Sequence, residues 1–155
     1  MRMKIKIVKK DDYFKNAEFF KQNLGYVFNM DRKLVKVYDS MFNGFAKVFN
    51  AEDNFLVIAC DENHIYSIAS FECEDGIWMI DSVSTREEFR GKGLATEVLK
   101  AGMMQKNIDF NLHVAKTNAP AFNLYKKLGF KINSTHPYQL DGSFFMTKSQ
   151  ENFEK

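Results

Sequence analysis

The sequence predicts one domain of mixed α and β structure, of the α/β or α+β class, and three observations lead to that prediction. Its 155 residues (1–155) match the length of one ordinary domain, which can bury a core without disulfides or metals. Hydrophobic residues make up 45% and aromatic residues 15% of the chain, far more than a disordered chain carries. Strand-like apolar runs both follow one another and alternate with amphipathic helical stretches, a pattern typical of a mixed sheet with surrounding helices.

The first third of the chain predicts a strand followed by two helices. Charged and apolar residues alternate over Arg2–Val8, which indicates a half-buried or edge strand. Asp11 and Asp12 then begin an amphipathic pattern that reaches Leu24, and acidic residues suit the positive end of a helix. A second helix, ending near Asn43-Gly44, is indicated by apolar residues on one face. These residues are Leu34, Val37, Tyr38 and Met41.

The middle of the chain predicts three consecutive strands. Two apolar runs, Phe55–Cys60 and Ile65–Glu72, are separated by the polar turn Asp61-Glu62-Asn63 and therefore indicate a hairpin. The turn Glu74-Asp75-Gly76 leads into a further strand, Ile77–Thr85.

The remainder predicts a helix, a strand, a helix and two closing strands. Gly93–Gln105 has helical periodicity directly after a glycine loop, Phe110–Val114 is a strand pattern, and Asn118–Leu128 is again helical. Asn118 suits a helix N-cap and Gly129 the left-handed position after a helix. From Phe130 onward we expect two strands around Asp141-Gly142.

Charge and cysteine content restrict the function. The 22 basic and 20 acidic residues leave a net charge of only +2, so we expect no nucleic-acid partner. No apolar run approaches the ~18 residues of a membrane span, and the first ten residues lack a signal-peptide pattern. We therefore expect a cytoplasmic protein without a membrane partner. Cys60 and Cys73 fit neither a metal site nor a redox pair, and we expect reduced thiols and no metal.

The most informative segment runs from Val83 to Ala95. A strand ends there, and Gly91 and Gly93 open a helix. The free N–H groups and positive dipole of a first helical turn bind phosphate, and glycines allow close approach. No P-loop string occurs, and a dinucleotide-binding loop would need a third glycine where Thr96 stands. Without further motifs, a plain glycine-rich turn that caps a helix remains an equal alternative.

Two motifs resemble signatures of the GCN5-related N-acetyltransferase superfamily. The first is Arg90-x-x-Gly93-x-Ala95. The second, at the expected distance downstream, comprises Asn118, Ala121, Leu124, Tyr125, Lys127, Gly129 and Phe130. The resemblance implies a mixed, mostly antiparallel central sheet with helices on both faces and a central parallel strand pair that splays apart around acetyl-coenzyme A. Glu87 departs from the pattern, because many members carry proline at that turn position.

The resemblance also implies which residues contact the cofactor. The backbone of the strand end would meet the pantetheine arm, the N–H groups of the glycine loop and helix start would hold the pyrophosphate, and three residues of the later helix would lie near the cofactor. These residues are Val83, Ser84 and Thr85; Arg90, Gly91, Lys92, Gly93, Leu94, Ala95 and Thr96; and Asn118, Asn123 and Lys126.

Acetyl transfer to an amine needs a proton donor for the leaving thiolate and a base for the ammonium. By resemblance, Tyr125 is the expected donor, although its helix face is equally compatible with core packing. His113 lies on the strand face opposite Leu112 and Val114 and is the candidate base, with Asp81 second and ordered water a third option. A partly exposed histidine without a role is the alternative for His113. His64 and His136 lie in turns and are expected at the surface.

The resulting hypothesis is an N-acetyltransferase that acts on a primary amine of a small molecule or a protein. A non-catalytic acyl-coenzyme A-binding sensor on the same fold is the alternative, and a nucleotide-binding regulator fits the motifs least well. Seven phenylalanines of the N-terminal third are expected to be partly core and partly an acceptor pocket or a homodimer contact. They are Phe14, Phe19, Phe20, Phe28, Phe42, Phe45 and Phe49.

Overall fold

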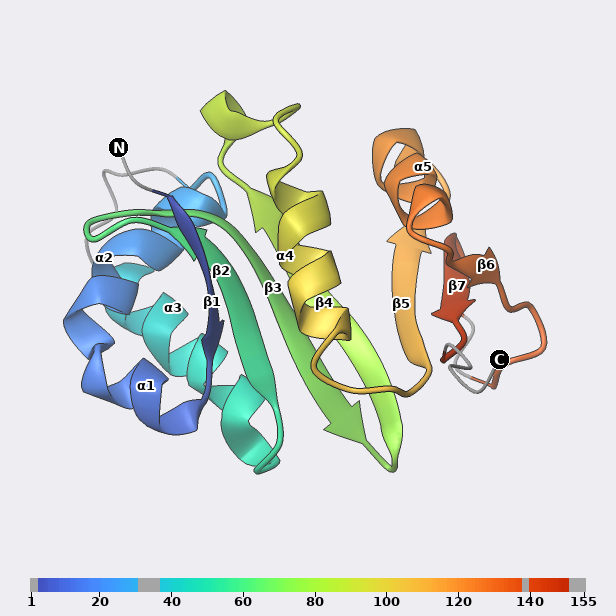
Figure 1. Cartoon of the computed structure of the whole chain (residues 1–155), viewed down its shortest axis with the longest axis horizontal. Coiled ribbons are helices and arrows are strands. Elements are labelled where there is room, and N and C mark those ends of the chain that lie inside the picture. Colours follow the sequence, from blue (N-terminus) through green and yellow to red (C-terminus); the bar gives the residue numbers. More distant parts are fainter. Residues whose placement is uncertain (1–2, 31–36, 138–139, 151–155) are drawn as a thin grey trace.

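The computed structural model describes residues 3–30, 37–137 and 140–150. Within these ranges one seven-stranded sheet has the order β1-β2-β3-β4-β5-β7-β6 (Figure 1). The strands are β1 (Lys4–Val8), β2 (Phe55–Cys60), β3 (Ile65–Glu74), β4 (Ile77–Thr85), β5 (Phe110–Ala115), β6 (Lys131–Ile132) and β7 (Ser143–Lys148). Neighbouring strands are antiparallel except for β4 and β5, which are parallel.

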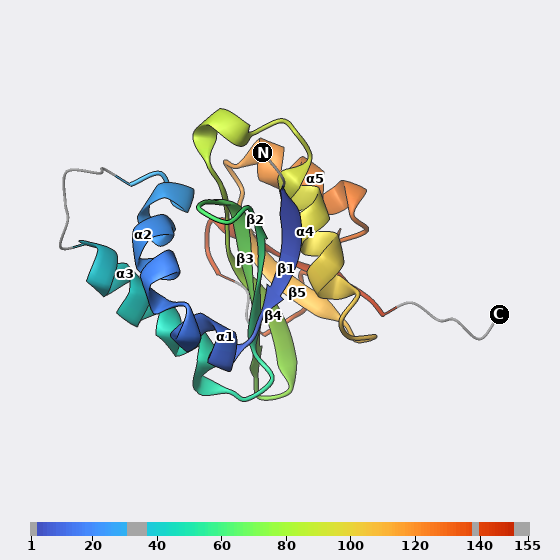
Figure 2. The same ribbon diagram turned by 60° about the vertical axis from the view of Figure 1, so that its left-hand side comes forward.

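Helices cover both faces of this sheet. On one face lie α1 (Lys10–Lys15), α2 (Ala17–Val27) and α3 (Val37–Phe45), and on the other lie α4 (Leu94–Met103) and α5 (Ala119–Lys127) (Figure 2). Two short 3₁₀ helices, η1 (Ala46–Asn50) and η2 (Glu87–Phe89), complete the described elements. The predicted fold class is therefore confirmed. None of the described helices is both long enough and apolar enough to cross a bilayer.

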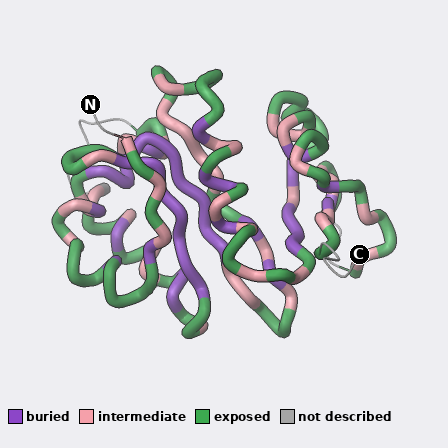
Figure 3. The backbone as a smooth tube through the Cα atoms, in the orientation of Figure 1, coloured by how far each residue is buried: buried purple, intermediate pink, exposed green. Residues whose placement is uncertain are grey.

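Two hydrophobic cores lie on opposite faces of the sheet, and the strands between them are buried on both sides (Figure 3). The six residues of β2 are all buried, which is why this segment is continuously apolar instead of alternating. In the core under α1–α3, the Tyr13 ring stacks on Phe42 at 4.5 Å and its hydroxyl donates to the Phe42 carbonyl at 2.7 Å. Most of the predicted aromatic set belongs to this core, whereas Phe14 is 45% exposed.

The N-terminal helices differ from the prediction in one respect. The stretch predicted as one helix is divided at Asn16, whose φ of −110° and ψ of 34° are not helical. The side chain of Asn16 donates to the Asp12 carbonyl at 2.8 Å, a local bond by which asparagine competes with helix continuation. Leu34, predicted on the second helix, lies outside the described residues.

Helix α4 packs closely on β3 at Gly102, and a substitution there tests this packing. A Cβ atom at Gly102 would lie 2.1 Å from Cζ of the buried Phe71 ring. We predict that Gly102→Ala lowers the free energy of unfolding by about 1–3 kcal/mol, because the ring cannot retreat within a packed core. Urea denaturation measures the change.

Gly44 on α3 is the matched control. A Cβ there would meet no heavy atom within 4 Å, so Gly44→Ala should leave stability unchanged or raise it by about 0.5–1 kcal/mol. Equal stability of both alanine variants would contradict the close packing of α4 on β3.

Candidate functional site

The parallel strands β4 and β5 pair at one end only. Their ladder holds two register pairs, Trp78 with Phe110 and Met79 with Asn111. Beyond these pairs β4 continues to Thr85 and β5 to Ala115, and the two strands diverge toward their carboxyl ends (Figure 1). The predicted splayed pair is thus confirmed. Its open end lies outside the carboxyl ends of parallel strands, the usual place for ligands in such sheets.

A β-bulge in β4 accompanies this divergence. Ile68 is opposite Ser84 and Ser70 is opposite Asp81, so β4 has one residue more than β3 between these pairs. Ser82, inside the bulge, has a φ of +50°, which is uncommon for a residue other than glycine. A bulge bends its strand and increases its twist, and it therefore redirects the strand end that was predicted to meet the pantetheine arm. The sequence gives no signal for this bulge.

The closed end of the pair is fixed by a chain of side-chain hydrogen bonds. Asn111 Nδ2 donates to the Trp78 carbonyl at 3.1 Å, and Thr147 Oγ1 donates to Asn111 Oδ1 at 2.7 Å. Asn133 Nδ2 in turn donates to Thr147 Oγ1 at 3.1 Å. Asn111 is buried, so these bonds tie β4, β5 and β7 together at the point where the ladder ends.

The glycine loop has the geometry of an anion-binding helix start. Gly91 and Gly93 have φ of +78° and +80°, and Gly93 is the N-cap of α4 without a side-chain cap. The first-turn N–H groups of α4 are thus open to a ligand, at the positive end of the helix dipole. Arg90 Nε approaches the Thr85 carbonyl at 3.4 Å, and Lys92 Nζ lies 5.2 Å from the centre of the Phe89 ring. This arrangement suits phosphate groups.

Helix α5 begins as predicted. Asn118 is its N-cap and accepts a hydrogen bond from the Ala121 N–H at 3.2 Å. Asn123 and Lys126 are exposed on this helix, and Lys126 Nζ lies 5.6 Å from the centre of the Phe122 ring. Their contacts with a cofactor stay predictions.

Tyr125 is buried on α5, with 7% of its surface exposed, and its ring meets Phe130 edge-on at 6.0 Å. It belongs to the core beneath α4 and α5. Burial raises the pKa of its phenol, which keeps the group protonated at neutral pH. Packing and proton donation are therefore compatible roles for this side chain.

His113 and Asp81 occupy corresponding positions on the two diverging strands, each two residues beyond the last ladder pair. Burial raises the pKa of Asp81, the nearby His113 lowers it and Glu74 raises it. The His113 ring meets the buried Phe145 edge-on at 5.1 Å. His113 thus faces a partly apolar environment with a carboxyl group across the gap.

Of the two histidines expected at the surface, one is exposed and the other is not. His64 is exposed, as predicted. His136 is instead half-buried, because its ring stacks on Phe145 at 4.1 Å with an interplanar angle of 14°. Phe145 therefore contacts the rings of both His113 and His136.

Two acidic residues of β3 lie on the strand next to Asp81 of β4 and were not among the predicted site residues. Ser70 pairs with Asp81, and the alternate residues Glu72 and Glu74 continue on the same strand face. Burial raises the pKa of Glu72, although Ser70 Oγ donates to its Oε2 at 2.9 Å, and the negative charges of Asp81 and Glu74 raise it further. The alternation of polar residues at the end of a hydrophobic strand was the available signal.

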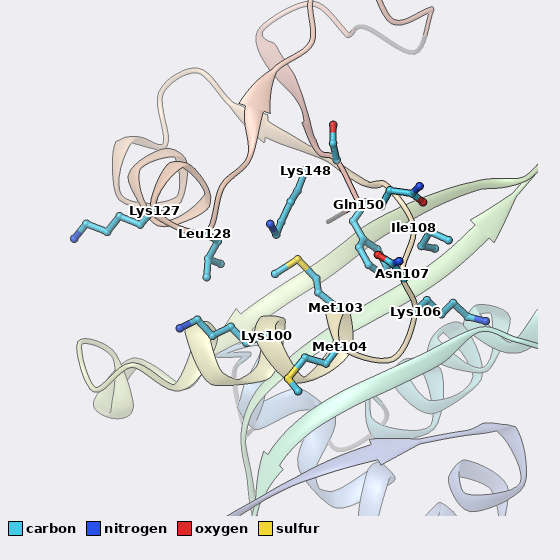
Figure 4. A pocket seen from close by; sticks show the side chains of 12 residues that line it. Lys100, Met103, Met104, Lys106, Asn107, Ile108, Lys127, Leu128, Lys148 and Gln150 are labelled. Carbon is cyan, nitrogen blue, oxygen red and sulfur yellow. The ribbon is translucent and has the colours of Figure 1, made fainter. Parts of the chain in front are cut away.

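A cavity of about 480 Å³ lies elsewhere, at the C-terminal end of α4 (Figure 4). Four lysines and several apolar side chains line it, among them Lys100, Lys106, Lys127, Lys148, Met103 and Leu128. None of the predicted site residues in the described ranges belongs to its lining. The glycine loop lies at the opposite, N-terminal end of α4. No three His, Cys, Asp or Glu side chains of the described residues group so as to hold a metal ion.

Comparison with known proteins agrees with this geometry. The family model described as "FR47-like protein" matches residues 61–138, half of the chain. The chain belongs to the FR47-like family, of the GCN5-related N-acetyltransferase type. The match covers β3, β4, the glycine loop, α4, β5 and α5.

Curated proteins match parts of the chain. An N-alpha-acetyltransferase of Saccharolobus solfataricus is 40% identical over 67 residues, which cover 39% of this chain and 40% of that protein. A spermidine N(1)-acetyltransferase of Escherichia coli K12 is 27% identical over 115 residues, which cover 70% and 56%. The chain thus spans about half or less of the length of the curated relatives it matches.

Solved structures share the fold. A PaiA N-acetyltransferase of Thermoplasma acidophilum in complex with coenzyme A has a TM-score of 0.63 at 15% identity, with 96% of this chain and 99% of that chain covered. The structure of PH1933 from Pyrococcus horikoshii OT3 has a TM-score of 0.70 at 21% identity, with 97% and 100% covered.

The glycine loop yields a binding prediction. We expect acetyl-coenzyme A at 100 times its dissociation constant to stabilise the protein by about 2.7 kcal/mol. In Gly93→Val the shift should disappear, because valine disfavours the left-handed backbone that opens the first turn of α4. Thermal unfolding with and without the cofactor measures it.

Gly76 supplies a control with matched geometry. Its φ of +77° and open surroundings resemble those of Gly93, but it lies in the turn between β3 and β4. Gly76→Val should lose similar stability and keep the ligand-induced shift. A shift that survives in Gly93→Val would remove the glycine loop from the binding site.

Proposed function

We propose that this protein is an N-acetyltransferase that transfers the acetyl group of acetyl-coenzyme A to a primary amine of a small molecule or a protein. The single observation that carries the proposal is the divergence of β4 and β5 beside the uncapped start of α4. The names of the matched relatives and the coenzyme A complex of a structural neighbour support it. Because acetyl-coenzyme A is an intracellular metabolite, we also propose that the protein acts in the cytoplasm.

The residues present fit such a co-substrate. The first-turn N–H groups of α4, with Arg90 and Lys92 nearby, supply positive potential for a pyrophosphate. The backbone of Val83–Thr85 lies on the strand end that turns away from β5 after the bulge, where a pantetheine arm would be bound like an added strand. When bound, the co-substrate supplies an activated acetyl thioester.

The opposite face of the sheet suits the arrival of an amine. A lysine-like ammonium has a pKa near 10.4, so only about one molecule in 2,500 is neutral at pH 7. Glu72, Glu74 and Asp81 would attract the cationic form. His113, in its neutral form, would then remove the proton, with Asp81 close enough to favour the imidazolium that results.

Tyr125 would protonate the leaving thiolate. The thiolate that would accept this proton is the conjugate base of a thiol whose pKa is near 8.5. Burial raises the pKa of Tyr125, so the phenol is protonated at neutral pH but is a weaker acid than an exposed tyrosine. A non-catalytic acyl-coenzyme A sensor would require the glycine loop alone. The combination of a protonated phenol with a carboxyl–imidazole pair across the gap favours the enzyme.

The donor role predicts a kinetic change without a binding change. Tyr125→Phe should lower turnover by roughly 10²–10⁴-fold, the range for general acid catalysis, and leave acetyl-coenzyme A affinity nearly unchanged. Tyr13→Phe is the control, because it removes another buried hydroxyl, in the core under α1–α3. Equal turnover in Tyr125→Phe and the parent would assign Tyr125 to packing.

The base role predicts a pH dependence. An imidazole accepts a proton only when neutral, so kcat/KM should fall on the acid side of its pH profile. His113→Gln should lose most activity and this acid limb together. His136→Gln removes the second imidazole that contacts Phe145 and should keep the limb. An unchanged limb in His113→Gln would transfer the role to Asp81 or to water.

A further inference from the structure

Helix α2 ends in a closure at which glycine is the usual residue. The Asn29 N–H donates to the Tyr26 carbonyl at 3.0 Å, and the Met30 N–H donates to the Gly25 carbonyl at 2.9 Å. These two bonds form a Schellman motif, whose left-handed position is most often glycine. Asn29 occupies that position with φ of +58°. Asparagine tolerates this conformation better than most residues, and it adds a carboxamide that glycine lacks.

That carboxamide bridges two backbone groups far away in the sequence. Its Nδ2 donates to the Thr85 carbonyl at 3.2 Å, and its Oδ1 accepts the Glu87 N–H at 2.8 Å. Thr85 is the last residue of β4 and Glu87 the first of η2. One side chain just after the end of α2 therefore holds the backbone on both sides of Arg86, where β4 leads into the glycine loop.

Neighbouring contacts bring the same elements together. Ser84 Oγ donates to the Val27 carbonyl at 2.8 Å, which joins β4 to the last residue of α2. The Arg86 N–H donates to the Tyr66 carbonyl at 2.9 Å, and the Arg86 guanidinium lies 5.7 Å from the centre of the Tyr26 ring. Among these described contacts, the carboxamide of Asn29 is the one that binds the backbone before and after Arg86.

We infer that Asn29 is a positioning residue for acetyl-coenzyme A: its carboxamide holds the end of β4 and the start of the glycine loop in the binding conformation, and so couples helix α2 to the cofactor site. The inference rests on the proposed function. A site that is ordered before binding loses less affinity to ordering, since the apparent dissociation constant rises as the binding-competent fraction falls. The carboxamide supplies the donor for Thr85 and the acceptor for Glu87 from one side chain.

Two substitutions separate positioning from stability. Asn29→Gly removes the carboxamide and preserves the left-handed helix end, whereas Asn29→Ala removes the carboxamide and disfavours that conformation. We expect both variants to bind acetyl-coenzyme A about 5- to 10-fold more weakly by titration calorimetry, the effect of losing about one net hydrogen bond's contribution. KM for acetyl-coenzyme A should rise similarly with little change in kcat, and only the alanine variant should melt clearly lower.

Hydrogen exchange tests the two hydrogen bonds of the Asn29 carboxamide without any cofactor. The Glu87 amide, protected by Asn29 Oδ1 in the parent, should exchange faster in both variants. Unchanged affinity in both variants, or affinity that follows the melting temperature instead of the carboxamide, overturns the inference. A parent protein that binds no acetyl-coenzyme A overturns the proposed function and the positioning role with it. An unchanged exchange rate of the Glu87 amide contradicts its protection by Asn29, whether or not the parent protein binds acetyl-coenzyme A.

Discussion

The functional architecture of this protein depends on the divergence of β4 from β5. At the closed end, the buried Asn111 ties β5 to the Trp78 carbonyl and to Thr147 on β7. At the open end, the bulge around Ser82 bends β4 away while β5 remains fully paired with β7. Two parallel strands cannot stay hydrogen-bonded under both constraints, and the backbone near the end of β4 becomes available to a ligand.

The two faces of the sheet supply different chemistry to this opening. On one face, α4 presents an uncapped positive helix start and α5 holds Tyr125 in a core that keeps its phenol protonated. On the other face, Asp81 of β4 lies near His113, and Glu72 of β3 lies near Asp81. Under the proposed function, the anionic cofactor and the cationic acceptor would approach opposite sides of one gap, and the thioester and the amine would meet between the diverging strands. Asn29, just after α2, hydrogen-bonds the end of β4 at Thr85 and the start of η2 at Glu87.

Local conformational rules predicted much of this fold from the sequence. Gly129 has the left-handed φ predicted for its position, and Asn118 caps α5 as predicted, because these preferences act within a few residues. The missed features depend on tertiary contacts. Ser82 is left-handed because β4 has one residue more than β3 at the bulge. The pKa of Glu72 is raised by burial in the folded sheet and further by Asp81 and Glu74. Asn29 and Asn111 bond to groups 56 and 33 residues away, which no local pattern encodes.

The central claim is that acetyl-coenzyme A occupies the opening between β4 and β5 and is held at the start of α4. A ¹H–¹⁵N correlation spectrum recorded during titration with acetyl-coenzyme A tests it residue by residue. If the cofactor binds there, the largest chemical-shift changes fall on the amides of Val83–Thr85 and Gly91–Thr96. Shifts confined to the lysine-lined cavity at the C-terminal end of α4, around Lys100 and Ile108, would place the ligand elsewhere and contradict binding between β4 and β5.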